Sequence, residues 1–158
     1  MFLEPLVTGD RGCRHHLGAA NITDVWRSFN KTYSLIFAGG AIGTVIRYLL
    51  SGMHPIASLP IGILLANMIG SLILGGVVTY IEEFSPLGAQ RIRATLGTGL
   101  CGGLTTFSSL CAGTIALAQS HSDFLALLYA TLTLFFGLAA FTSSVVSVRL
   151  ISSQRKGS

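Results

Sequence analysis

Glycines and hydroxyl side chains gather in the third of four long apolar stretches of this sequence. Residues 97 to 109 read GTGLCGGLTTFSS, in which Gly102 and Gly103 directly precede a run of hydroxyl residues. A helix break at this glycine pair would free backbone carbonyls at membrane depth, which is tolerated only where protein or a cavity surrounds them. Such carbonyls could coordinate a monovalent cation. The alternative is a tightly packed helix whose Ser and Thr side chains bond to their own carbonyls.

One amide side chain lies near the middle of the second apolar stretch. It belongs to Asn67, and Ser71 follows one helical turn later. An amide in lipid needs a partner, and an interhelical hydrogen bond worth about 1 kcal/mol would provide one. The NH2 group could equally hold an anion inside a pore, since it offers two donors. The residues alone leave both interpretations open.

The first apolar stretch combines small residues with a basic residue. Gly39 and Gly43 are four residues apart, and Arg47 follows one turn later. Small residues at this spacing let helices approach closely in lipid. Arg47 could extend its charge to the interface as an anchor. It could also be a buried charge that fixes a dimer contact or attracts anions.

In the fourth apolar stretch, Tyr129, Thr133 and Gly137 recur every four residues. This spacing puts two hydroxyls and a gap on one face of a helix. Such a face is consistent with a polar track through the membrane. An ordinary packed helix that carries a few hydroxyls is the alternative.

These residues must be positioned by membrane-spanning helices. The chain has 158 residues, of which 51% are hydrophobic and 10% are charged, and its mean hydropathy is +0.68. Each apolar stretch is long enough to cross about 30 Å of hydrocarbon, and only a helix satisfies its own backbone there. The sequence therefore predicts an all-α integral membrane protein with four transmembrane helices, at residues 33–50, 59–80, 92–118 and 124–150.

The polar ends of the chain flank this membrane domain, which we expect over residues 33–150. Residues 1–32 are polar and mixed and lack the apolar core of a secretory signal, so we expect a disordered cytoplasmic tail. A start codon assigned too early would explain the same segment. Residues 151–158 form a short polar C-terminal tail. The loops between spans are too short to hold a soluble catalytic domain.

The basic residues predict the orientation of the chain. Four spans put both termini and the loop between the second and third spans on one side of the membrane. That side carries Arg27, Lys31, Arg91, Arg93, Arg149, Arg155 and Lys156, whereas the other side has at most Arg47. The positive-inside rule then predicts cytoplasmic termini. Because these residues flank apolar segments and form no single basic face, the net charge of +4 does not indicate a nucleic-acid partner.

Three motifs occur in order, one in each of the first three spans. They are GGxxGxxxRY at Gly39 to Tyr48, NxxG at Asn67 to Gly70, and GGLTTFS at Gly102 to Ser108. With them the chain resembles the CrcB/Fluc family of fluoride channels over residues 34 to 150. The resemblance implies a multi-pass protein of the plasma membrane that lowers cytoplasmic fluoride by passive export and so confers fluoride resistance.

The resemblance also implies an architecture and a set of site residues. It implies an antiparallel dimer with two fluoride pathways, and a broken third helix whose carbonyls at Gly102 and Thr105 hold a central structural sodium ion. Asn67 would donate to fluoride and Phe107 would offer its ring edge. The remaining polar path would run along Ser109, Tyr129 and Thr133, and Arg47 would lie at a vestibule or dimer contact.

Two departures from the family pattern favour a heterodimer. The family usually has a second phenylalanine three residues after the first, where this chain has Leu110. The family also often has an acidic residue shortly after, which this chain lacks, with Gly113 nearby. The charge bias also indicates one fixed orientation, whereas subunits that insert both ways need balanced flanks. We therefore expect dimerisation with an oppositely oriented paralogue. A dual-topology homodimer is the alternative.

Three other functions compete with the fluoride channel. A non-conducting or structural partner subunit would have the same composition. A small four-helix multidrug transporter would need a membrane-embedded carboxylate, and the predicted spans contain no Asp or Glu. An enzyme is not expected, because His15, His16, His54 and His121 lie in the tail and loops without a nucleophile or a metal-binding partner at recognisable spacing.

Overall fold

Four helices of this protein are long and apolar enough to cross a membrane. The computed structural model describes residues 22–52, 59–120 and 123–156. Its candidate spans are Asn30–Ser51, Ile61–Phe84, Ala89–Ser120 and Asp123–Arg155. The prediction of an all-helical, multi-pass membrane protein with four spans is thereby confirmed.

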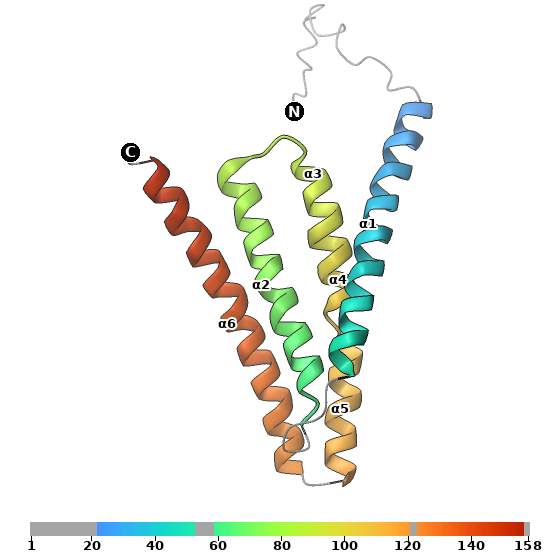
Figure 1. The fold of residues 1–158 in the computed structure, drawn as a ribbon, viewed down its shortest axis with the longest axis vertical. Coiled ribbons are helices and arrows are strands. Elements are labelled where there is room, and N and C mark those ends of the chain that lie inside the picture. The colour runs from blue at the N-terminus through green and yellow to red at the C-terminus, as the bar shows by residue number, and fades with distance from the viewer. Residues whose placement is uncertain (1–21, 53–58, 121–122, 157–158) are drawn as a thin grey trace, which may run out of the picture.

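The first, second and fourth spans are single continuous helices, whereas the third consists of several segments. The continuous helices are α1 (Ile22–Ser51), α2 (Ile61–Phe84) and α6 (Asp123–Lys156). The third span comprises α3 (Ala89–Ile92), the π-helix η1 (Arg93–Cys101), α4 (Gly102–Leu104) and α5 (Phe107–Ser120). In Figure 1 the start of α1, the α2–α3 connection and the end of α6 lie at one end of the bundle, hereafter the terminal end.

Proline and glycine mark both ends of α2. Pro60 directly precedes the first residue, where its missing N–H costs no helical hydrogen bond. At the other end Ser85 adopts a left-handed conformation, with φ of 40°, and donates its N–H to the carbonyl of Ile81 over 3.0 Å. Gly88, with φ of 85°, then turns the chain into α3. The connection between the second and third spans is therefore a tight turn.

Several helices extend beyond their predicted bounds. The segment 22–32, expected to be part of a disordered tail, is helical in α1, and α6 continues through Lys156 of the predicted C-terminal tail. The helix α2 reaches Phe84, so that Glu82 and Glu83 lie in its last turn. Extending an existing helix costs far less than starting one, so polar residues continue it beyond the apolar stretch. Residues 1–21 lie outside the described residues.

Glycines set a close crossing between α1 and the third span. A Cβ atom at Gly39 would collide with the carbonyl oxygen of Thr95, and one at Gly43 would collide with that of Leu100. From the opposite side, a Cβ at Gly103 would collide with the backbone of Gly40. The small-residue spacing in the first span therefore serves packing within one chain.

The helix α2 packs along α6, and polar contacts join the two at the terminal end. Ser152, which is only 2% exposed, donates its hydroxyl to the Glu83 carboxylate over 2.8 Å. The guanidinium carbon of Arg155 lies 5.9 Å from the centre of the Phe84 ring. The acidic residues of α2 are thus held at the end of the bundle and lie away from its middle.

Candidate ion-binding site

The helical pattern of the third span is interrupted at two threonines. The helix α4 ends at Leu104, Thr105 is extended with φ of −79° and ψ of 149°, and α5 begins at Phe107. The backbone stays helical through Gly102, where φ is −63° and ψ is −35°. The sequence suggested a break at the glycine pair, but the interruption lies after it. Gly103 makes the close contact with α1 and does not change the direction of the backbone.

Two backbone carbonyls next to the interruption lose their regular helical donors. In a continuous helix the N–H of Thr106 would bond to Gly102 and that of Ser109 to Thr105. Instead, the Thr106 N–H donates to Asn67 Oδ1 over 2.8 Å, and the Ser109 N–H donates to Thr106 Oγ1 over 3.2 Å. The carbonyls of Gly102 and Thr105 are thereby left available to another partner.

Asn67 of α2 holds the interruption in place. Its Oδ1 accepts the Thr106 N–H, and its Nδ2 lies 3.4 Å from the Thr106 carbonyl oxygen, to which it donates. An amide carries two N–H donors, so one remains for a further acceptor. The structure thus has the interhelical hydrogen bond that the sequence suggested, and the second N–H of Asn67 remains for an anion.

Thr106 caps the N-terminus of α5, a role that the sequence analysis missed. Besides accepting the Ser109 N–H, its Oγ1 donates to Ser109 Oγ over 3.1 Å and lies 3.1 Å from Ser108 Oγ. The signal was present in the sequence, because threonine is a preferred N-cap residue and the next helical stretch starts directly after it. Thr106 is therefore bonded through its backbone to α2 and through its side chain to α5.

An open groove of about 630 Å³ runs beside the interruption, between α2, the third span and α6. Five of the eight predicted site residues line it: Asn67, Gly102, Thr105, Phe107 and Thr133. Ser71, Thr98 and Thr106 add further polar groups. The Phe107 side chain is 72% exposed, whereas Thr133 is nearly buried and donates its hydroxyl to the Tyr129 carbonyl over 2.8 Å. The tertiary fold thus brings most of the predicted pathway onto one surface.

The other predicted site residues lie outside this lining. Ser109 is bonded to Thr106 at the start of α5. Tyr129 is only 1% exposed and belongs to a core cluster between α5 and α6, with its hydroxyl 3.5 Å from the Pro60 carbonyl oxygen. Arg47 lies on α1, and its buried Nε has no hydrogen-bond partner among the described residues.

Leu110, where the resembled family has a second phenylalanine, is 4% exposed and lines the groove from α5. Its side chain joins the same core cluster as Tyr129 and Leu117. An aliphatic side chain at this position thus both lines the groove and contributes to the core between α5 and α6.

Together these features define a small multi-pass helical membrane protein with a polar groove beside an interrupted span. The family described as "CrcB-like protein, Camphor Resistance (CrcB)" matches residues 34–145. The chain belongs to this CrcB family.

Curated relatives of the chain carry a common name. A protein of Bacillus subtilis (strain 168), named "Fluoride-specific ion channel FluC 2", is 39% identical over 131 residues, which cover 80% of this chain and 96% of the relative. A Methanopyrus kandleri protein named "Fluoride-specific ion channel FluC" is 36% identical over 118 residues, covering 74% of this chain and 88% of the relative. The expectation that the protein is not an enzyme agrees with this family.

Proposed function

We propose that this protein is a subunit of a fluoride-selective channel that lowers cytoplasmic fluoride by passive export across the plasma membrane. The observation that carries the proposal is the interruption at Thr105 and Thr106, which Asn67 holds beside a polar groove in a chain of the CrcB family. The printed names of the relatives support fluoride as the ion.

The donors around the groove suit a small anion that must lose its water. Fluoride is strongly hydrated, so a selective pathway must replace its water with closely spaced hydrogens. The spare N–H of Asn67 and the positive ring edge of Phe107 supply such hydrogens. The N-terminus of α5 adds the positive end of a helix dipole at the same place. An inside-negative potential favours the exit of one anion by about 2.3 kcal/mol per 100 mV.

We also propose the structural sodium ion at the carbonyls of Gly102 and Thr105. Both oxygens lack their regular helical donors, because the N–H groups of Thr106 and Ser109 bond to side chains instead. Gly102 itself is exposed, and a Cβ atom there would have nothing within 4 Å. A hard monovalent cation accepts backbone carbonyls as ligands. Bound there, it would supply positive charge that makes the low-dielectric interior more favourable to a passing anion.

A second subunit in the opposite orientation would complete both the groove and the sodium site. The groove is open and the Phe107 ring beside it is largely exposed, so another copy could supply the missing wall. The interruption in the third span would then act as the broken helix that meets its counterpart. We expect the partner to be a paralogue, since the basic residues favour one orientation with both termini in the cytoplasm. The alternative is a homodimer.

A non-conducting partner subunit is the second candidate function. It is favoured by Leu110, whose aliphatic side chain gives the groove no ring edge at that position. A multidrug transporter finds no comparable support. Among the described residues the acidic side chains Glu82, Glu83 and Asp123 all lie in a terminal turn of α2 or α6.

Fluoride efflux from liposomes tests the proposal. The purified protein is reconstituted alone and together with an opposite-topology paralogue, and release is followed with a fluoride electrode while chloride efflux serves as the control. Selective release by the protein alone would establish a homodimeric channel and overturn the heterodimer. Release only with the paralogue is the expected result. No fluoride release by folded protein in either case would favour the non-conducting role.

A further inference from the structure

A second hollow lies at the terminal end of the bundle, between α1 and α3. It has a volume of about 520 Å³ and is lined by Asn30, Lys31, Ser34 and Leu35 of α1 and by Arg91 of α3. None of these residues lines the groove described above. We call it the basic pocket.

The lining of the basic pocket is suited to an anion. Lys31 and Arg91 contribute positive charges from two different helices, and both are exposed. Asn30 adds an amide group that can donate hydrogen bonds. An arginine fork and a lysine ammonium together can bind several oxygens of one phosphate.

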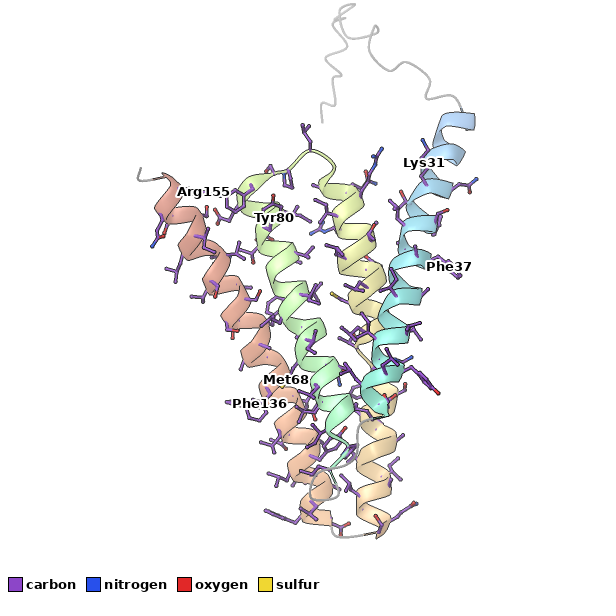
Figure 2. The ribbon with its side chains drawn as sticks, in the orientation of Figure 1. Lys31, Phe37, Met68, Tyr80, Phe136 and Arg155 are labelled. Carbon is purple, nitrogen blue, oxygen red and sulfur yellow. The ribbon has the colours of Figure 1, made fainter. Side chains whose placement is uncertain are left out.

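The depth of the basic pocket in the membrane favours a lipid as the source of that phosphate. Asn30 begins the first candidate span, so Lys31 lies in its first turn, and Arg91 lies in the first turn of the third span. Both charges therefore lie where the spans leave the hydrocarbon. Figure 2 shows Lys31 near one end of α1, with Phe37 further along the helix toward its middle. Phe37 is 79% exposed and Tyr33 61%, as expected for aromatic side chains at the lipid interface.

We propose that the basic pocket binds the phosphate headgroup of an anionic phospholipid. Basic pockets between helices on the cytoplasmic side are suited to such headgroups. Lys31 and Arg91 pair with the phosphate, while Leu35 provides an apolar edge toward the acyl chains. The bound lipid links α1 to the third span, close to the glycine crossing of the same two elements. This inference does not depend on the fluoride pathway.

Native mass spectrometry of the full chain in detergent tests the proposal. Phosphatidylglycerol and phosphatidylcholine with identical acyl chains are titrated separately against the wild type and against the double variant Lys31→Gln/Arg91→Gln. Binding of the first phosphatidylglycerol should weaken about 30-fold in the variant, because each cation near an anionic headgroup contributes a factor of roughly five. Phosphatidylcholine binding should hardly change.

A charge-matched control separates the basic pocket from general attraction. Arg93→Gln/Arg155→Gln also removes two charges at the terminal end. Arg93 lies against Gly97 and Arg155 over Phe84, and neither lines the basic pocket. The control should bind phosphatidylglycerol nearly as the wild type does. An equal loss in both double variants, or equal wild-type binding of the two lipids, would overturn the proposal.

Two further measurements complete the test. Inorganic phosphate is added as a competitor, and displacement of the lipid at matched concentration would identify a soluble anion as the ligand and reject the lipid. If the double variant does not fold, the single variant Arg91→Gln is measured, for which a loss of about fivefold is expected. Unchanged affinity in that folded variant would also reject the assignment.

Discussion

At the scale of single residues, the Asn67–Thr106 contact determines the chemistry of the third span. A backbone group left unpaired in lipid costs several kcal/mol, so an interrupted helix must find partners for the groups it releases. Asn67 pairs with both the N–H and the carbonyl of Thr106, and the Thr106 hydroxyl pairs with the start of α5. The same bonds leave the Gly102 and Thr105 carbonyls without regular donors, which is the feature that a cation site requires.

Asn67→Ala should destabilise the protein. The substitution leaves the N–H and carbonyl of Thr106 without their partners, and each unsatisfied buried group costs about 1–3 kcal/mol. Thermal unfolding in detergent measures the loss, with Ser71→Ala as the matched control because Ser71 lines the same groove. Equal unfolding temperatures for the two variants would contradict this role of Asn67.

Phe107→Leu should slow fluoride efflux while leaving stability nearly unchanged. Phe107 is 72% exposed, so its removal from the subunit costs little packing. An aromatic contact contributes up to about 1.5 kcal/mol, which corresponds to roughly a tenfold slower efflux. Phe124→Leu is the control, since Phe124 is 71% exposed on α6 and does not line the groove. The role of the ring edge would be refuted if both variants conducted alike in liposomes.

At the scale of elements, close packing of α1 against the third span holds the interruption at a fixed position. Gly43 and Gly103 allow the two backbones to meet where side chains would otherwise separate them. The π-helix η1 makes part of this contact, at Thr95 and Leu100. The α1 contact and the hydrogen bonds between α2 and Thr106 thus hold the third span from two different helices.

Gly43→Ala should weaken this packing by about 1–3 kcal/mol, the usual cost of an overfilled contact. The new Cβ would collide with the backbone of Leu100, which cannot move aside as a flexible side chain can. Gly40→Ala is the control in the same helix, because its Cβ would have only an ordinary contact of 3.8 Å with the Gly99 carbonyl oxygen. Thermal unfolding in detergent compares the two. Similar losses in both variants would mean that the crossing tolerates added volume.

At the scale of the whole molecule, the groove beside the interruption is open, which fits the proposed dimer. Its lining combines one amide and several hydroxyls with apolar side chains such as Leu110, Leu134 and Phe141. In the proposed dimer the positive-inside rule would set the orientation of this subunit, and an oppositely oriented partner would bring two interruptions together. Figure 2 shows Arg155 and Lys31 at the terminal end of the bundle.

Removing sodium should destabilise the assembled protein. A cation held by the Gly102 and Thr105 carbonyls binds the folded dimer alone, so sodium at 100 times its dissociation constant would add about 2.7 kcal/mol. The unfolding temperature is measured in sodium chloride and in N-methylglucamine chloride at equal ionic strength, and fluoride efflux is recorded in both. No difference between the two salts would rule out a structural sodium ion.

The chain should insert in a single orientation with its C-terminus in the cytoplasm, since basic residues concentrate at the terminal end. A C-terminal fusion to a fluorescent reporter should be active, and a fusion to a periplasmic phosphatase should not. Activity of both fusions would demonstrate dual topology and favour the homodimer.

The sequence by itself determined the number and type of the spans and most of the positions proposed for the pathway, five of which line the groove. Both follow from local chemistry, because a long apolar run in lipid must be helical and an amide or a hydroxyl run within it needs partners. Asn67, Gly102 and Thr105 were identified in this way or through the family motifs.

The tertiary structure alone decided where the third span is interrupted and which residues hold it. The sequence suggested a break at Gly102 and Gly103 as one of two interpretations, whereas the interruption lies at Thr105 and Thr106, and the role of Thr106 was missed. Tyr129, expected on the polar path, lies in the core cluster, and its part in a fluoride pathway stays a prediction. The physical reason is that the Asn67–Thr106 bonds join residues 39 positions apart, and Gly103 is used for contact with α1. Local propensity contains no information about such partners.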